Sequence, residues 1–218
     1  MALTPAERIQ NRVWGGYRKA AAKLGRPKEV FRPTDPMNPL RLIDLVGTYP
    51  IAVDASPDFK FNGPARPGVA LHYALVDGAE VQAGDYFVGD EYVFFLGEMA
   101  PLQSIMAVRC NVVITLMRSI DMSDFGSTEP PGTMQDVALF ANWPASILRR
   151  GRGPGDDVPL PGDVNPSEYE CLLPVVYGVD PPRSGDVLVD EHERRFAVDA
   201  FNPVSTGWSL SVRLLAAA

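Results

Sequence analysis

The residue types that most often perform catalysis or bind metal ions are scarce in this sequence. There are two histidines and two cysteines. His72 lies in an apolar run, where a buried strand histidine is expected. Residues 192–196 begin like the HExxH zinc motif, but Phe196 stands where the second histidine is required. Cys110 and Cys171 form no CxxC pair and are expected to be free thiols. We therefore predict no catalytic residue and no metal site among them.

One glycine-rich loop could in principle hold phosphate or calcium. Residues 151–155 read Gly-Arg-Gly-Pro-Gly but lack the Lys-Ser/Thr pair of a phosphate-binding loop. Asp156, Asp157 and Asp163 follow without the spacing of a calcium loop. We expect no cofactor and favour a protein that is not an enzyme and acts through its surface. An enzyme remains the alternative.

The charged residues are distributed unevenly along the chain. The sequence has 218 residues and a formal net charge of −7. Residues 1–33 contain eight basic and two acidic residues, a balance of +6, so the remainder carries −13. The acidic body would repel phosphates, so direct nucleic-acid binding is disfavoured, and the basic arm suits an acidic partner. No signal peptide or spanning segment is recognisable, so we expect synthesis in a cytoplasm and no membrane partner.

The basic arm has the pattern of a capped helix. Thr4-Pro5-Ala6-Glu7 offers a capping box with proline at the first helical position, and Gly25 and Pro27 mark its end. The apolar residues recur at spacings of three and four: Ala6, Ile9, Val13, Tyr17, Ala20 and Leu24. Gly15-Gly16 interrupts the helix with poor helix formers, which indicates a kink or a close contact.

Two interpretations of this helix remain open. A third, a DNA-binding helix, is disfavoured because the acidic body would repel DNA. The helix packs on the protein's own body, or it docks a neighbouring subunit or acidic surface with Trp14 and Tyr17 as aromatic anchors. A second basic cluster follows the Trp143-Pro144 corner. The candidate partner-binding residues are Arg8, Arg12, Trp14, Tyr17, Arg18, Lys19, Lys23, Arg149, Arg150 and Arg152.

From residue 34 onward, short apolar runs alternate with Gly, Pro and Asp, which predicts strands and turns. Two halves of this region resemble each other. The string Gly84–Val88 is echoed by Gly185–Val189, and a phenylalanine follows each string seven residues later. An aromatic residue followed by proline occupies a corresponding position in each half, Tyr49-Pro50 in the first and Trp143-Pro144 in the second. We favour tandem duplication, with chance convergence of a turn motif as the alternative.

These patterns predict a mainly β protein: an N-terminal α-helical arm followed by two tandem small antiparallel β-barrel or sandwich modules. We expect the arm over 1–33, the first module over 34–120, a linker over 121–138 and the second module over 139–218. The last strand of the first module is expected at 105–117, where the apolar run is longest.

The string Gly84-Asp85-Tyr86-Phe87-Val88-Gly89, followed by Phe94-Phe95 and by residues 101–111, carries a resemblance. It is similar to a family of virion structural proteins of tailed bacteriophages and prophages that have a GDYLVG-type turn and a PLxPIxAVRxN stretch. Residues 18–39 and 142–146 match the same family's opening and second half. Ser104 departs from the family's second proline, which affects only a turn.

The resemblance implies a non-enzymatic component of the tail, neck, head-to-tail or fibre-anchoring region, made in the host cytoplasm and located in the virion. Its partners would be other virion proteins (portal, adaptor, nozzle, baseplate or fibre) and further copies of itself in a symmetric ring. Two alternatives stay open. One is a receptor- or carbohydrate-binding module, with Trp143, Trp208 and Tyr177 lining a groove. The other is a cell-wall hydrolase.

Overall fold

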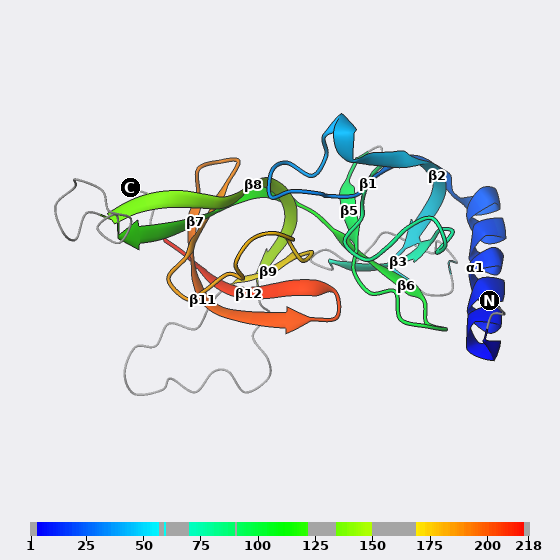
Figure 1. Ribbon diagram of the computed structural model, residues 1–218. Coiled ribbons are helices and arrows are strands. Elements are labelled where there is room, and N and C mark those ends of the chain that lie inside the picture. Colours follow the sequence, from blue (N-terminus) through cyan, green and yellow to red (C-terminus); the bar gives the residue numbers. More distant parts are fainter. Residues whose placement is uncertain are drawn as a thin grey trace.

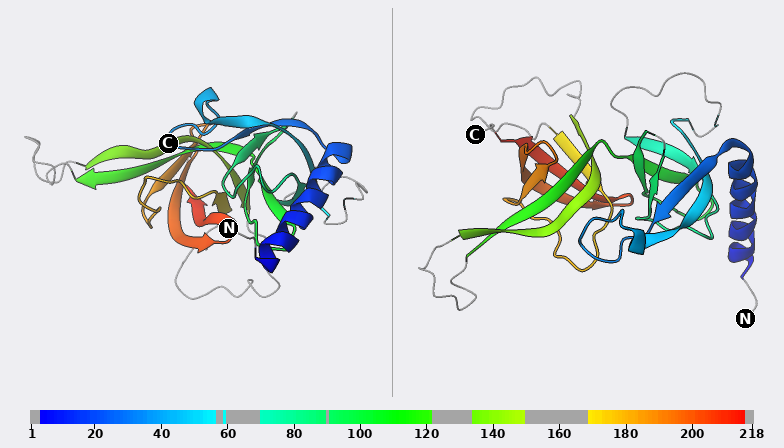
Figure 2. Two further views of the ribbon diagram at one scale, coloured as in Figure 1. Left: turned by 45° about the vertical axis from the view of Figure 1, so that its right-hand side comes forward. Right: turned by 90° about the horizontal axis from the view of Figure 1, so that it is seen from above.

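The computed structural model describes residues 4–56, 59, 70–89, 91–121, 134–149 and 169–215. It contains one long helix, α1 (Pro5–Leu24), and twelve strands arranged in two closed barrels. The helix, the first barrel and the second barrel lie in line, with α1 at one end of an elongated molecule (Figure 1, Figure 2). The mainly β architecture with an N-terminal helix is as the sequence predicts.

Barrel 1 is built from the first six strands. They are β1 (Arg26–Phe31), β2 (Leu45–Asp54), β3 (Leu71–Leu75), β4 (Tyr86–Val88), β5 (Val93–Leu96) and β6 (Ile105–Arg109), with a 3-10 turn η1 (Leu42–Asp44) before β2. Their order around the barrel is β1-β2-β3-β6-β5-β4, and every neighbouring pair is antiparallel. The barrel closes because β4 pairs back onto β1.

Barrel 2 repeats this plan. Its strands are β7 (Val112–Asp121), β8 (Met134–Arg149), β9 (Tyr169–Leu173), β10 (Val187–Asp190), β11 (Arg195–Val204) and β12 (Gly207–Leu214). Around the barrel they run β7-β8-β9-β12-β11-β10, and β10 pairs back onto β7. Counted from the first strand of each barrel, the two orders are identical. This is the relationship that the repeated turns in the sequence indicate.

Two expected boundaries are wrong. Residues 26–31 do not belong to a helical arm of 1–33, because they form β1 and pair with both β2 and β4. The expected single strand over 105–117 is two strands separated at Cys110 and Asn111, and β7 belongs to barrel 2. The junction between barrels therefore lies at these two residues and not in 121–138, of which 134–138 begin β8 and 122–133 lie outside the described residues. The apolar run is continuous there because one barrel's buried strand leads directly into the next.

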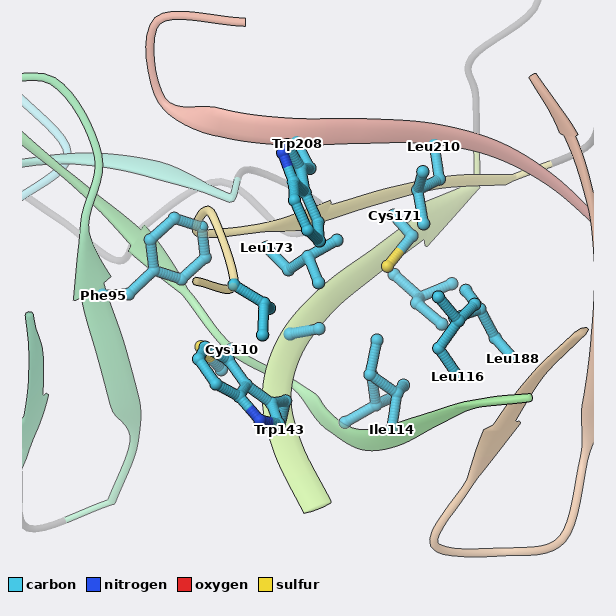
Figure 3. Packing of buried hydrophobic residues seen from close by; sticks show 14 of the residues in the cluster. Phe95, Cys110, Ile114, Leu116, Trp143, Cys171, Leu173, Leu188, Trp208 and Leu210 are labelled. Atoms are coloured by element: carbon cyan, nitrogen blue, oxygen red, sulfur yellow. The ribbon is translucent and has the colours of Figure 1, made fainter. Parts of the chain in front are cut away.

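A single apolar cluster extends through the junction into both barrels. Tyr86 of barrel 1 packs against Trp143 of barrel 2, and Phe95 packs against Tyr86. Figure 3 shows Phe95 and Trp143 among the strands of this core. The Tyr86 hydroxyl donates to the Pro144 carbonyl at 2.7 Å, and Trp143 Nε1 donates to the Pro36 carbonyl at 2.9 Å. Because buried polar atoms are satisfied across the junction, the two barrels form one packed body.

The aspartate of each Gly-Asp turn forms hydrogen bonds inside its barrel, which the sequence did not indicate. Gly84 and Gly185 adopt φ of +91° and +95°, the left-handed region that favours glycine. Asp85 next to Gly84 accepts two hydrogen bonds from Arg32, from Nε at 2.8 Å and from Nη2 at 2.7 Å, and a third from the Gln82 backbone at 2.9 Å. The side-chain hydrogen bonds to Asp85 raise the pKa of Arg32.

Barrel 2 contains the same clamp at the equivalent turn. Arg118 donates to Asp186 from Nε at 2.9 Å and from Nη2 at 2.8 Å, and the backbone of Arg183 donates to the same carboxylate at 2.8 Å. Each arginine comes from the first strand of its barrel or from the residue that follows it, and each aspartate precedes the fourth strand. The clamp therefore ties the strands that close each barrel.

Candidate partner-binding site

Helix α1 begins with the predicted capping box. Thr4 N donates to Glu7 Oε2 at 2.6 Å, and Glu7 N donates to Thr4 Oγ1 at 3.3 Å. The hydrogen bond from the Thr4 backbone is the main reason why the pKa of Glu7 lies below its usual value. The helix continues without interruption through Gly15-Gly16 to Leu24, so these glycines mark no break.

One face of α1 packs on barrel 1, over β2 and β3. Ala21 is fully buried against Ala52 and Leu75. The Trp14 indole lies directly on Gly78, where a side chain would collide with the ring. Two polar contacts hold the same face: Leu102 N donates to Gln10 Oε1 at 2.8 Å, and the Tyr17 hydroxyl donates to the Gln103 carbonyl at 3.5 Å.

The first interpretation of the helix is therefore confirmed for this face, which docks on the protein's own body. Trp14 and Tyr17 are half-buried against barrel 1 and serve to hold the helix there. The predicted apolar stripe is too long at both ends, because Ile9 and Leu24 are each 51% exposed. Only the middle of the stripe, at Tyr17 and Ala20, finds apolar partners in barrel 1.

The opposite face of α1 carries a row of cations. Arg8, Arg12, Lys19 and Lys23 are spaced by four, seven and four residues, which places them on one side of the helix, and all four are exposed. None of them forms an ion pair with a residue that the structure describes. We call these four residues the basic stripe. Exposed cations in one row provide a surface complementary to an acidic partner.

Gly15 and Gly16 lie in the middle of the basic stripe, between Arg12 and Lys19. A Cβ added at either glycine would meet no atom within 4 Å. Nothing in the described structure therefore requires glycine at these two positions. Together they leave a stretch of bare helical backbone between two pairs of cations.

Arg18 lies beside the basic stripe and faces a shallow depression of about 360 Å³, which Tyr49, Pro50, Asp77 and Glu80 also line. Its Nε is 3.8 Å from Asp77 Oδ2, and the Tyr49 hydroxyl is 3.5 Å from Glu80 Oε2. The acidic groups in this depression thus already have partners within the protein.

The second predicted cluster is placed only in part. Arg149 ends β8 in barrel 2 and is exposed, next to Leu148, which lies beside Ala70 and Leu71 of barrel 1. Helix α1 packs on the other side of barrel 1, over β2 and β3 (Figure 2). Arg150 and Arg152 lie outside the described residues. The structure therefore does not bring Arg149 together with the basic stripe.

Sequence reasoning missed an apolar projection before β2. Leu42 and Ile43 are 84% and 82% exposed, more than any other large apolar side chain in the described part of the chain. The 3-10 turn that carries them projects from barrel 1 at the top of Figure 1. We call this pair the apolar knob. The signal in the sequence is an aliphatic pair between Arg41 and Asp44.

The apolar knob is held by buried and half-buried charges. The Asp44 side chain is fully buried and accepts from Thr34 Oγ1 at 2.7 Å and from Arg41 Nη2 at 3.0 Å. Arg41 Nη2 also donates to Asp35 Oδ2 at 2.6 Å, and this hydrogen bond is the main reason why the pKa of Asp35 is lowered. Leu42 and Ile43 are therefore exposed on a turn whose conformation these hydrogen bonds fix.

The residues with catalytic potential have ordinary structural positions. His72 is buried, with Nδ1 3.0 Å from the Ala70 carbonyl, as predicted for a strand histidine. His192 is exposed in the β10–β11 turn. Cys110 and Cys171 are free and buried, and burial raises the pKa of both thiols. Within the described ranges, no three His, Cys, Asp or Glu residues gather closely enough to hold a metal ion.

The aromatic groove required of a carbohydrate-binding module is not formed by the expected residues. Trp143 and Trp208 are 1% and 6% exposed and belong to the core, so these two residues do not line the groove that this alternative requires. Tyr177 is 66% exposed. Among the described helices, none is long and apolar enough to pass through a bilayer.

Comparisons of this chain with protein-family models, with curated proteins and with solved structures find no match. Its fold and its surfaces are therefore interpreted from its own residues.

Proposed function

We propose that the protein is a non-enzymatic structural component of a tailed-bacteriophage virion, in the tail, neck, head-to-tail or fibre-anchoring region. It acts through contacts with other virion proteins and with further copies of itself in a symmetric assembly. The observation that carries this proposal is the basic stripe on an otherwise acidic chain. Its four cations point away from barrel 1 and pair with no described residue.

The shape of the molecule supports an assembly role. The helix and barrel 2 lie at opposite ends of one packed body (Figure 2). A rigid subunit with different surfaces at its two ends suits head-to-tail contacts, which close into rings when the rotation between subunits allows. The apolar knob adds a second surface, since exposed large aliphatic side chains on a fixed turn are typical of protein contacts.

The resemblance to virion proteins points in the same direction. Its most specific string begins with Gly84-Asp85, and Asp85 is fully buried in the clamp with Arg32. The shared string thus maintains the barrel, which is what a family with a common scaffold and no common active site would retain.

Detection of the protein in purified virus particles tests the proposal. Mass spectrometry of particles should find it at a fixed copy number per virion. The double variant Leu42→Ser/Ile43→Ser should fold but enter particles at least tenfold less. Val204→Ser is the matched control, because Val204 is also exposed but lies in β11, away from the apolar knob. Absence of the wild-type protein from particles would contradict the proposal.

A further inference from the structure

Gly15 and Gly16 lower the stability of α1, and nothing in the described structure requires glycine there. Apart from proline, glycine is the least favourable residue in a helix interior. At Gly25 and Gly78 the fold provides a reason, since a Cβ there would collide with the Ile51 backbone or the Trp14 indole. At Gly15 and Gly16 there is open space around the Cβ position. The isolated protein would be more stable with alanine at both positions.

Their position indicates what the glycines are for. They interrupt the basic stripe at its centre, with Arg8 and Arg12 on one side and Lys19 and Lys23 on the other. Without side chains, the helix backbone is open to close approach by another surface. A ridge that enters this gap comes within reach of cations on both sides.

We propose that Gly15-Gly16 and the basic stripe form a docking site for the acidic body of a second copy of this chain. The inference rests on the proposed function and names the partner of its basic surface. Two copies of α1 cannot face each other across the glycines, because like charges would meet along the whole stripe. The contact is therefore between different surfaces of the two copies. Residues 34–218 carry a formal charge of −13 and supply the complementary surface.

This geometry has a consequence for assembly. A contact between unlike surfaces leaves each copy with one surface still free, so further copies add until a ring closes or a filament grows. The contact is electrostatic at its edges, so salt weakens it. The glycines at its centre make it depend on the size of the side chains there.

Sedimentation velocity of the full-length protein at several salt concentrations tests the inference. We expect oligomers at low salt that dissociate as salt rises. The double variant Gly15→Gln/Gly16→Gln fills the gap with neutral, helix-favouring side chains. It should associate at least tenfold more weakly than the wild type and should have a higher melting temperature. Lys19→Glu/Lys23→Glu should also weaken association at least tenfold.

Ala6→Gln is the matched control, since it adds the same side chain at an exposed helical position away from the basic stripe. It should assemble like the wild type. Three results would overturn the inference: a wild type that stays monomeric at every salt concentration, a glycine variant that assembles normally, or one that melts at a lower temperature. Binding of a labelled DNA duplex to the basic stripe of a monomeric protein would also overturn it.

The two proposals can fail separately. A protein found in particles but monomeric when purified would leave the virion role standing and remove the docking site. A protein that self-assembles through the glycines but is absent from particles would do the reverse.

Discussion

The guanidinium of Arg118 and the carboxylate of Asp186 form two parallel hydrogen bonds of 2.9 and 2.8 Å, although 68 positions of sequence separate the two residues. Arg32 holds Asp85 in the same way in barrel 1. In each barrel the pair joins the first strand to the turn before the fourth, which is the seam where the barrel closes. Bidentate pairs of this kind fix geometry as well as adding stability.

Asp186→Asn should destabilise the protein strongly. Arg118 and Asp186 have side chains that are only 13% and 4% exposed, so the substitution leaves a largely buried guanidinium without its counter-charge. We expect the free energy of unfolding to fall by about 3 kcal/mol. Asp180→Asn is the control, because Asp180 also contacts Arg118 but is 66% exposed. Its effect should stay within about 0.5 kcal/mol. Urea denaturation measures both variants, and equal losses would contradict the prediction.

The two barrels should unfold in a single transition. The Tyr86 hydroxyl and the Pro144 carbonyl form a buried hydrogen bond between them, and the core is continuous across the junction. Tyr86→Phe should lower the free energy of unfolding by about 1–2 kcal/mol, while circular dichroism and tryptophan fluorescence still give coincident curves. Tyr177→Phe, at a position 66% exposed, should leave the midpoint unchanged. Separate transitions in the wild type would show that the barrels are independent.

Gly78→Ala should release α1 while leaving the barrels folded. The added methyl group would collide with the Trp14 indole, so the helix that carries the ring has to shift away from the barrel. We expect rapid proteolysis within α1 and a red shift in tryptophan fluorescence, with the β-sheet signal retained. Gly178 is the control, since it occupies the corresponding turn after β9 and has no neighbour within 4 Å. Gly178→Ala strains a φ of +80° but should leave α1 protected from protease.

The two thiols should be unreactive in the folded protein. Burial raises the pKa of Cys110 and Cys171, so both stay protonated where an exposed cysteine begins to ionise, near pH 8.5. A disulfide reagent at pH 8 should modify them only as fast as the protein unfolds. Fast modification without denaturant would contradict this.

The same pKa shift predicts a pH effect on stability. Because the folded pKa of each thiol is raised, the unfolded chain loses these protons first as pH increases. The free energy of unfolding should therefore be unaffected by the thiols below about pH 8.5 and should decrease above it. In the variant Cys110→Ser/Cys171→Ser this decrease should be smaller. Denaturation at pH 7, 9 and 10 measures the difference.

Local patterns predicted much of this structure. The capping box and the length of α1 depend on neighbouring residues, and so do the Gly-Asp turns with their left-handed glycines. The sequence did not predict which strands pair with partners far away in the chain. Strand β1 contains Arg26, Pro27, Lys28 and Glu29, which have no strand preference, and it exists because β2 and β4 pair with it.

The candidate site shows the same division. The basic residues were identified from composition, but which of them share an outward face required the position of barrel 1. The carbohydrate-binding alternative requires Trp143 on a surface, but Trp143 is buried because Pro36 and Tyr86 from the other barrel cover it. The apolar knob was missed, since Leu42 and Ile43 have the composition of core residues and only the fold shows that nothing described covers them.

The shared strand order gives the molecule a direction. In barrel 1 the second strand, β2, contacts α1 near Pro50. In barrel 2 the second strand, β8, contacts barrel 1 at Pro144. Each barrel thus takes the preceding unit on the same strand. A further barrel inserted at Cys110 and Asn111 would pack on the preceding barrel through its own second strand. It would also be contacted by the second strand of the barrel that follows it. The molecule would then lengthen by one whole barrel while the surfaces at its two ends stayed unchanged.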